Sequence, residues 1–416
     1  MKLVPHLSTL VLLALLAAPA AGQNESDALT LSEALAYARA LNDPALARFD
    51  ERAEALEHAA VADGQLPDPM VTGQIANVPV DSFSFSQDGM TQALRLGIRQ
   101  EFPPGDTRRL MSNQRQRQAE VERARRSLSL RDIEREVALA WIEVVWREQA
   151  TRILADNHKA VAEQIESLAA RFASGRMHAQ DLLRAELELS LLEDRQIEHR
   201  QQADIARAAL SRYLGRHAFR SVPETLPTPA TPAAAERLET RLAEHPAVQV
   251  EQQQIEAADV GIELAEQAYK PKFALEGGFG WRTDRADLAS IGVTLSLPLF
   301  TDKRQDRRRA QAIGQRGAEA LDRDLLLHDL RRQLHEELAR WQRLEERLAL
   351  YRQALAERAR QTAEATLTTY ANGQTDFAEL IRALLAELQI DLKRTELEHA
   401  RAQSWARLVW LTGEPS

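Results

Sequence analysis

The sequence predicts a mainly α-helical fold with four β-strands, built from a duplicated helix–strand–strand–helix unit. Three observations lead to this prediction: two very long runs without proline, two pairs of segments in which apolar and polar residues alternate, and a constant spacing between matching residues of the two halves. Only 5% of the residues are aromatic and 28% are charged, which leaves little material for a large round core. Such a composition favours long helices packed side by side.

The proline-free runs cover residues 105–222 and 299–414 and are rich in Ala, Leu, Glu, Arg and Gln, which form helix readily. Residues 106–171 alone would form a helix of roughly 100 Å, at about 1.5 Å per residue. A helix of that length is expected only where neighbours bury a continuous seam, as in a coiled coil or a helical barrel. Each run therefore predicts a long helical hairpin, with its tip near Gly175 in the first and near Gly373 in the second.

Large apolar residues recur at three- and four-residue spacing along these helices and predict the packing seam. In the second run the seam comprises Leu327, Leu330, Leu334, Trp341, Leu344, Leu348, Tyr351 and Leu355. Glu337 is its one polar interruption. In the first run the same spacing occurs at Val161, Ile165, Leu168 and Phe172.

Alternation of apolar and polar residues predicts the strands. We expect them at about residues 70–78, 91–102, 272–281 and 289–299. Each is about ten residues long, which is the length that a tilted transmembrane strand requires. The edge of a soluble sheet would show the same alternation.

If the strands cross a membrane, one face meets lipid and the other meets a lumen. The residues expected to face lipid are Leu94, Leu96, Ile98, Leu295 and Leu297, and those expected to face the lumen are Arg95, Arg99, Thr294 and Ser296. Four strands cannot close a barrel, and open sheet edges are not tolerated in lipid. Either the strands lie outside a membrane or several chains pool them, and three chains would supply twelve strands around a wet lumen.

Matching residues in the two halves keep nearly one offset, which predicts an internal duplication. Pro44 and Pro246, and Pro69 and Pro271, are 202 residues apart, whereas Gly175 and Gly373, Arg184 and Arg382, and Gly215 and Gly413 are 198 apart. We expect a first repeat over 23–222, a proline- and threonine-rich linker over 223–232, and a second repeat over 233–416.

Residues 1–22 have the pattern of a signal peptide. Lys2 provides the positive charge, residues 10–16 the apolar core, and residues 18–20 or 20–22 a cleavage site of small residues. The alternative is a membrane anchor, but the apolar run is shorter than the ~20 residues of a spanning helix. The pattern therefore predicts export.

Composition and motifs argue against several classes of function. A net charge of −9 gives no electrostatic support for nucleic-acid binding. The chain has no cysteine, which excludes disulfides, thiolate metal sites and a cysteine-linked lipid anchor. His335 and Glu336 lack the second histidine of a zinc-protease motif, and His328 fits an exposed helix face better than a metal site. We expect no enzyme activity, no cofactor and no metal site.

The duplication, the segment 29–35 followed by Pro44, both strand pairs and the two glycine-centred tips together resemble the TolC-type outer-membrane efflux family. The resemblance covers essentially the whole chain after the signal peptide. It implies a homotrimer in the outer membrane of a Gram-negative bacterium, with a shared twelve-stranded barrel continued by a long periplasmic helical barrel. It also implies two partners, a periplasmic adaptor (membrane fusion protein) and an inner-membrane RND-type pump, and passive export of their substrate.

Three loop segments, 65–69, 77–81 and 100–107, are similar to family members paired with heavy-metal resistance pumps, which implies heavy-metal cations as cargo. These segments are loops and strand ends and not ligand sites. The alternatives are a duct for drug efflux or type I protein secretion, or a periplasmic coiled-coil adaptor or scaffold without a pore.

The resemblance further implies roles at the hairpin tips. Gly175 and Gly373 would receive the adaptor, although a turn with positive φ would require glycine by itself. Polar residues beyond each turn would close the resting channel, and here these are Gln180, Asp181, Tyr370 and Glu379. Thr375 stands where the family has a closing arginine, so that latch is incomplete. In a trimer, the carboxylates of Asp181 and Glu379 would form rings that favour cations.

Overall fold

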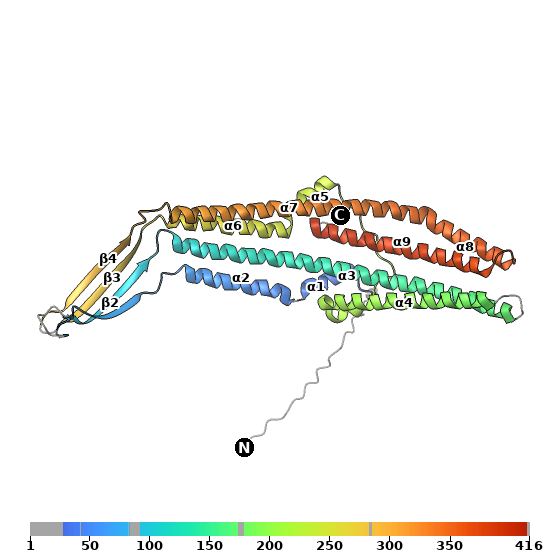
Figure 1. Cartoon of the computed structure of the whole chain (residues 1–416), viewed down its shortest axis with the longest axis horizontal. Helices are drawn as coiled ribbons and strands as arrows, with labels where there is room; N and C mark the ends of the chain where they lie inside the picture. Colours follow the sequence, from blue (N-terminus) through green and yellow to red (C-terminus); the bar gives the residue numbers. More distant parts are fainter. Residues whose placement is uncertain are drawn as a thin grey trace, which may run out of the picture.

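The computed structural model describes residues 28–41, 43–81, 83, 92–173, 179–282 and 285–413. The molecule is elongated, with a sheet at one end and the tips of two helical hairpins at the other (Figure 1). The elements in chain order are α1 (Leu31–Ala40), α2 (Pro44–Asp63), β1 (Met70–Ala76), β2 (Gln92–Phe102), α3 (Thr107–Ala173), α4 (Ala179–Leu214), η1 (Gly215–Phe219), α5 (Ala235–Arg241), η2 (Leu242–Glu244), α6 (Pro246–Gln267), β3 (Lys272–Arg282), β4 (Leu288–Ser296), α7 (Gln305–Leu350), η3 (Tyr351–Leu355), α8 (Ala356–Ala371) and α9 (Phe377–Thr412). The predicted signal peptide lies outside the described residues.

Local capping explains where the first helices begin. Thr30 and Glu33 form a capping box, in which the Glu33 amide donates to Thr30 Oγ1 (3.3 Å) and the Thr30 amide donates to Glu33 Oε2 (2.8 Å). Asp43 accepts from the amide of Ala45 (2.8 Å), and Pro44 occupies the first helical position, where its missing N–H costs nothing. Pro246 begins α6 in the same way.

The predicted long helix is confirmed: α3 has 67 residues and is therefore about 100 Å long. The second run is less regular than the sequence predicted, because the five-residue π-helical segment η3 separates α7 from α8. A π-helical turn holds more residues than an α-helical one and so rotates the helix face that follows. The seam residues reflect this: Leu348 is buried, whereas Tyr351 and Leu355 are only half-buried.

The helices pack side by side along the rod and not around one centre. Near the sheet α3 contacts α2 on one side and α6 on the other, and α6 contacts α7; towards the tips α3 contacts α4 and α9, and α9 contacts α8 (Figure 1). Apolar clusters follow one another along the axis, centred on Trp141, Leu334 and Leu380, which are at most 1% exposed. The Trp141 Nε1–H also donates to the carbonyl of Leu29 (2.9 Å), which ties the segment before α1 to α3.

The four strands form one antiparallel sheet in the order β1-β2-β3-β4. The central pair β2–β3 joins the two halves of the chain, and Phe102 stacks on Phe273 at its helical end (4.8 Å between centroids). Two strand ends differ from the prediction by more than one residue. Strand β1 ends at Ala76 because Asn77 has φ 55, and β4 ends at Ser296, before Pro298, which has no amide hydrogen for the ladder.

Candidate functional site

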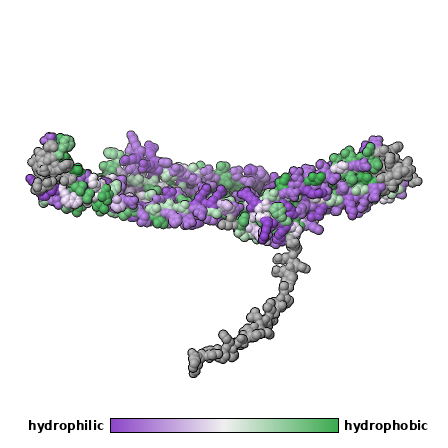
Figure 2. Space-filling view, turned by 90° about the horizontal axis from the view of Figure 1, so that it is seen from below, coloured by the Kyte–Doolittle hydropathy of each residue, from purple (hydrophilic) through white to green (hydrophobic). Residues whose placement is uncertain are grey.

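One face of the sheet is apolar and exposed. The register places Leu94, Leu96, Ile98 and Leu295 on this face, as the sequence predicted, with side chains 42–54% exposed. Leu297 lies one residue beyond the end of β4 and is not part of the strand. The same face carries Phe273, Leu275, Phe279, Trp281, Ile291 and Val293, all at least 40% exposed. Figure 2 shows hydrophobic residues at the sheet end, and further patches of them along the rod and near the tips, on an otherwise mostly hydrophilic surface. A continuous apolar surface of this kind indicates contact with lipid or with another protein.

The opposite face is polar and carries ion pairs across strands. Arg99 Nη1 contacts Glu276 Oε1 at 2.7 Å, and Lys272 Nζ contacts Glu101 Oε1 at 2.8 Å. The Thr294 hydroxyl also donates to Glu276 Oε1 (3.4 Å). The sequence predicted that Arg95 and Arg99 lie on this face, but it did not predict which residues they contact. A sheet with one apolar and one charged face is suited to separate lipid from water.

In the part of the chain that the structure describes, both lateral edges of the sheet are open. Strands β1 and β4 each pair with one described strand, and the helices that continue these edges carry exposed apolar residues. On the α4 edge these are Leu183, Leu187, Leu191, Ile197 and Ile205, which are 43–66% exposed. On the α7 edge they are Ile313, Leu321, Leu325 and Leu350, which are 43–70% exposed. Unpaired strand edges continued by apolar helix surfaces indicate a partner along the whole length.

The tip of the second hairpin is a tight turn at Gly373. Its φ is 70°, its amide donates to the Tyr370 carbonyl (3.0 Å), and the Gln374 amide donates to the Thr369 carbonyl (2.9 Å). A Cβ at this position would meet nothing within 4 Å, so glycine is needed for the backbone conformation and leaves an open surface. The first predicted tip, Gly175, lies outside the described residues.

The predicted gate residues are only partly brought together. Tyr370 packs edge-on against Phe377 (5.8 Å between centroids) at the second tip. Glu379 is exposed and pairs with Arg382 at 2.7 Å, so its negative charge is partly compensated. Gln180 is exposed on α4, and the side chain of Asp181 is outside the described part of the chain. The expected ring of Glu379 carboxylates stays a prediction.

A polar cluster in the middle of the rod connects α3, α4 and α9. Glu143 on α3 contacts His399 Nε2 (2.7 Å) and Arg147 Nε (2.7 Å), and the Trp146 ring stacks on His399 (4.3 Å). Burial alone would raise the pKa of Glu143, but the hydrogen bonds from His399 and Arg147 bring it below its ordinary value. Burial and the nearby Arg147 lower the pKa of His199. These contacts hold three helices together.

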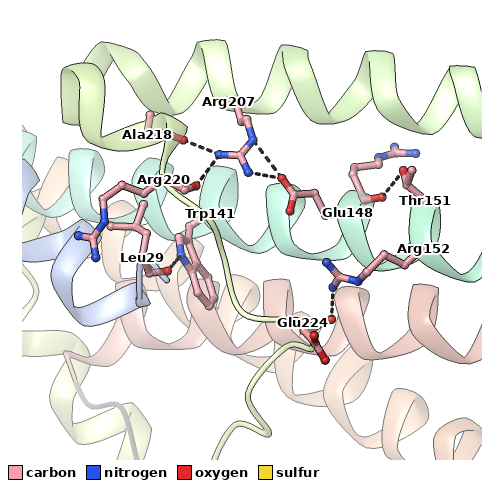
Figure 3. Close-up of polar contacts among 10 residues, drawn as sticks. Leu29, Trp141, Glu148, Thr151, Arg152, Arg207, Ala218, Arg220 and Glu224 are labelled. Atoms are coloured by element: carbon pink, nitrogen blue, oxygen red, sulfur yellow. Dashed lines mark hydrogen bonds and ion pairs between the residues drawn. The ribbon is translucent and has the colours of Figure 1, made fainter. Parts of the chain in front are cut away.

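Arg207 forms a second connection that the sequence did not predict (Figure 3). From α4 it reaches across to Glu148 on α3 and donates from Nη1 to the carbonyls of Ala218 (2.8 Å) and Arg220 (2.9 Å). It thereby ties the segment after α4 to the long helix. Arg207 and Glu148 are 59 residues apart, and no local pattern identifies such a pair.

In the ranges that the structure describes, no group of three or more histidines and carboxylates could hold a metal ion. Among the same residues, no helix combines the length and apolar character needed to cross a membrane.

The comparisons with known proteins agree with this geometry. Solved structures with the same fold include the outer membrane protein VceC of Vibrio cholerae (TM-score 0.75, 16% identity, covering 92% of this chain and 96% of that one) and a membrane protein of Pseudomonas aeruginosa (TM-score 0.78, 17% identity, 94% and 93%). They also include CusC, whose structures concern folding and transmembrane channel formation (TM-score 0.76, 15% identity, 92% and 92%). No curated protein matches the chain. Residues 238–414 match the family model of the outer membrane efflux proteins, and the chain shares the fold of these membrane proteins along nearly its whole length.

Proposed function

We propose that this chain is one subunit of a homotrimeric outer-membrane efflux channel. The observation that carries the proposal is the four-stranded sheet with one apolar face, one charged face and two unpaired edges. In lipid, every backbone hydrogen-bonding group must find a partner, so such a sheet is stable only when its edges are closed by other chains. Three copies supply twelve strands, which suffice for a barrel with a wet lumen.

The two edges are different surfaces, and this determines how copies meet. Strand β1 of one chain would pair with β4 of the next, and the α4 edge would lie towards the neighbour's α7 edge. Contacts between different surfaces generate a ring when the rotation between copies closes. The exposed apolar residues on both helical edges support the same contact along the rod, so the barrel would continue into a tube of helices.

The tips would meet the other components of the export system. They lie at the end of the rod opposite the sheet (Figure 1), which places them deep in the periplasm when the strands are in the outer membrane. We propose that Gly373, and by the sequence repeat Gly175, receive a periplasmic adaptor that connects to an inner-membrane RND-type pump. Gln180, Asp181, Tyr370 and Glu379 are proposed to gate the periplasmic mouth. The channel itself would conduct passively.

Heavy-metal cations are the proposed cargo, supported by the loop segments that are similar to members paired with metal-resistance pumps. A duct for drugs or for type I protein secretion would have the same architecture. A periplasmic scaffold without a pore is less well supported, because it would leave the apolar sheet face and both strand edges in water.

Fractionation and a resistance assay test the proposal. The full chain should sediment with outer membranes, and planar bilayers containing the purified protein should show single-channel conductance. A deletion strain should become sensitive to heavy-metal salts, and the native gene should restore resistance. A soluble periplasmic monomer would contradict the channel, whereas sensitivity to drugs alone would contradict only the cargo.

A further inference from the structure

On the polar face of the sheet, the Arg95 guanidinium has no carboxylate partner among the described residues. Two other cations on this face are paired: Arg99 with Glu276 and Lys272 with Glu101. Arg95 instead extends from β2 across β3 and donates from Nη2 to the hydroxyl of Ser290 on β4 (3.3 Å). Among the described residues it forms no ion pair. Its positive charge is therefore held in place but not neutralised.

Glycines make room for this arrangement. A Cβ at Gly278 would lie 3.0 Å from Ser290 Oγ, which is a tight contact, and 3.5 Å from Arg95 Nε, so a side chain there would crowd the serine that accepts from Arg95. A Cβ at Gly97 would lie 2.8 Å from Thr72 Oγ1. The result is a shallow basin of about 390 Å³ with a backbone floor and the guanidinium at its side.

The donors around this basin suit an anion. A guanidinium has five N–H groups in a planar fork, of which Ser290 accepts one. The remaining donors match carboxylate or phosphate oxygens. Thr72 and Gln74 on β1 line the same basin and can add neutral hydrogen bonds. Arg99 and Glu276 also line it, but they form an ion pair and add no net charge.

We propose that this Arg95 basin binds small anions, and that its three copies give the strand section of the channel a preference for anions over cations. The inference rests on the proposed function, because the basin faces a lumen only when three chains pool their strands. Rings of arginine are a general means of selecting anions in pores. A cationic cargo would then pass this section more readily when accompanied by its counter-ions.

The test is a reversal-potential measurement on the full-length protein in planar bilayers under a potassium chloride gradient, repeated with inorganic pyrophosphate on the sheet side. The native channel should favour chloride over potassium, and pyrophosphate should lower its conductance. In Arg95→Gln the chloride-to-potassium permeability ratio should fall to about 1 or below, and the pyrophosphate effect should disappear. Arg95→Lys retains the charge and should keep the chloride preference.

Lys272→Gln is the matched control, because it removes one positive charge from the same face of the sheet at a residue that pairs with Glu101 and does not line the basin. Its conductance should still respond to pyrophosphate. A native channel that favours cations, or an Arg95→Gln channel with native selectivity and native pyrophosphate response, would overturn the inference alone. A native protein that forms no channel would overturn the proposed function and the inference with it.

Discussion

Replacing Ile291 by arginine should impair membrane insertion, whereas the same replacement at the adjacent Gly292 should not. The two residues lie in the middle of β4 on opposite faces of the sheet, opposite Gly277 and Glu276 of β3. Ile291 is 91% exposed, so its replacement removes little packing within the chain. A side chain at Gly292 would start 3.7 Å from Glu276 Cβ, where an arginine can reach the carboxylate. Comparing the two variants therefore isolates the effect of the medium, lipid or water, that surrounds each face of the sheet.

The expected free-energy cost of arginine depends on how deep the residue lies in the bilayer. Arginine on the lipid face costs roughly 2–4 kcal/mol at the bilayer midplane and about 0–1 kcal/mol near the interface. Leu295 lies one residue from the end of β4, so arginine there would give a smaller effect than at Ile291. With three chains in a ring, Ile291→Arg should cost roughly 6–12 kcal/mol per trimer, provided the three contributions are independent.

Folding into lipid vesicles from urea, followed by heat-modifiable migration on gels, measures this cost. Ile291→Arg should give little folded trimer, and Gly292→Arg should fold to nearly the native yield. The reverse ranking would show that the charged face, and not the apolar face, meets lipid.

Three other variants test separate parts of the molecule. Gly373→Glu should leave trimer yield unchanged but abolish efflux-dependent resistance in cells; native resistance would mean that the tip is only a turn. Arg207→Ala should lower the free energy of unfolding by roughly 2–3 kcal/mol, since the Glu148 carboxylate and two carbonyls lose their donor, whereas the exposed control Arg332→Ala should have a much smaller effect. Equal effects in denaturant titrations would refute that reasoning. Burial lowers the pKa of His245 from 6.5 to about 4. The unfolded chain then binds the proton first, so stability should fall by up to about 3 kcal/mol as the pH drops from about 6.5 to about 4. His245→Asn keeps a helix-capping side chain and should remove this part of the pH dependence; an unchanged pH profile would contradict the assignment.

Periodicity made the repeated elements predictable. The three- and four-residue spacing around Leu334 predicted a seam that is buried, and the alternation around Leu96 predicted a strand with the expected apolar face. Both patterns act over a few neighbouring residues, which is why they can be read from the sequence. The segment η3 was missed because no proline or glycine marks it.

Contacts between distant residues could not be predicted. Arg99 and Glu276 are 177 residues apart, and Arg95 and Ser290 are 195 apart. Their meeting depends on the register between strands, which the turn and packing of the whole sheet determine. By contrast, the ion pair between Glu379 and Arg382 joins residues three apart on one helix, which is a spacing that the sequence alone can indicate.

The pooling of strands by three chains is tested most directly by native mass spectrometry of the full-length protein extracted from outer membranes in detergent. The proposed channel requires a mass of three chains, with strand content retained in circular dichroism. A stable monomer with intact strands would contradict it, because a four-stranded sheet would then persist with both edges open.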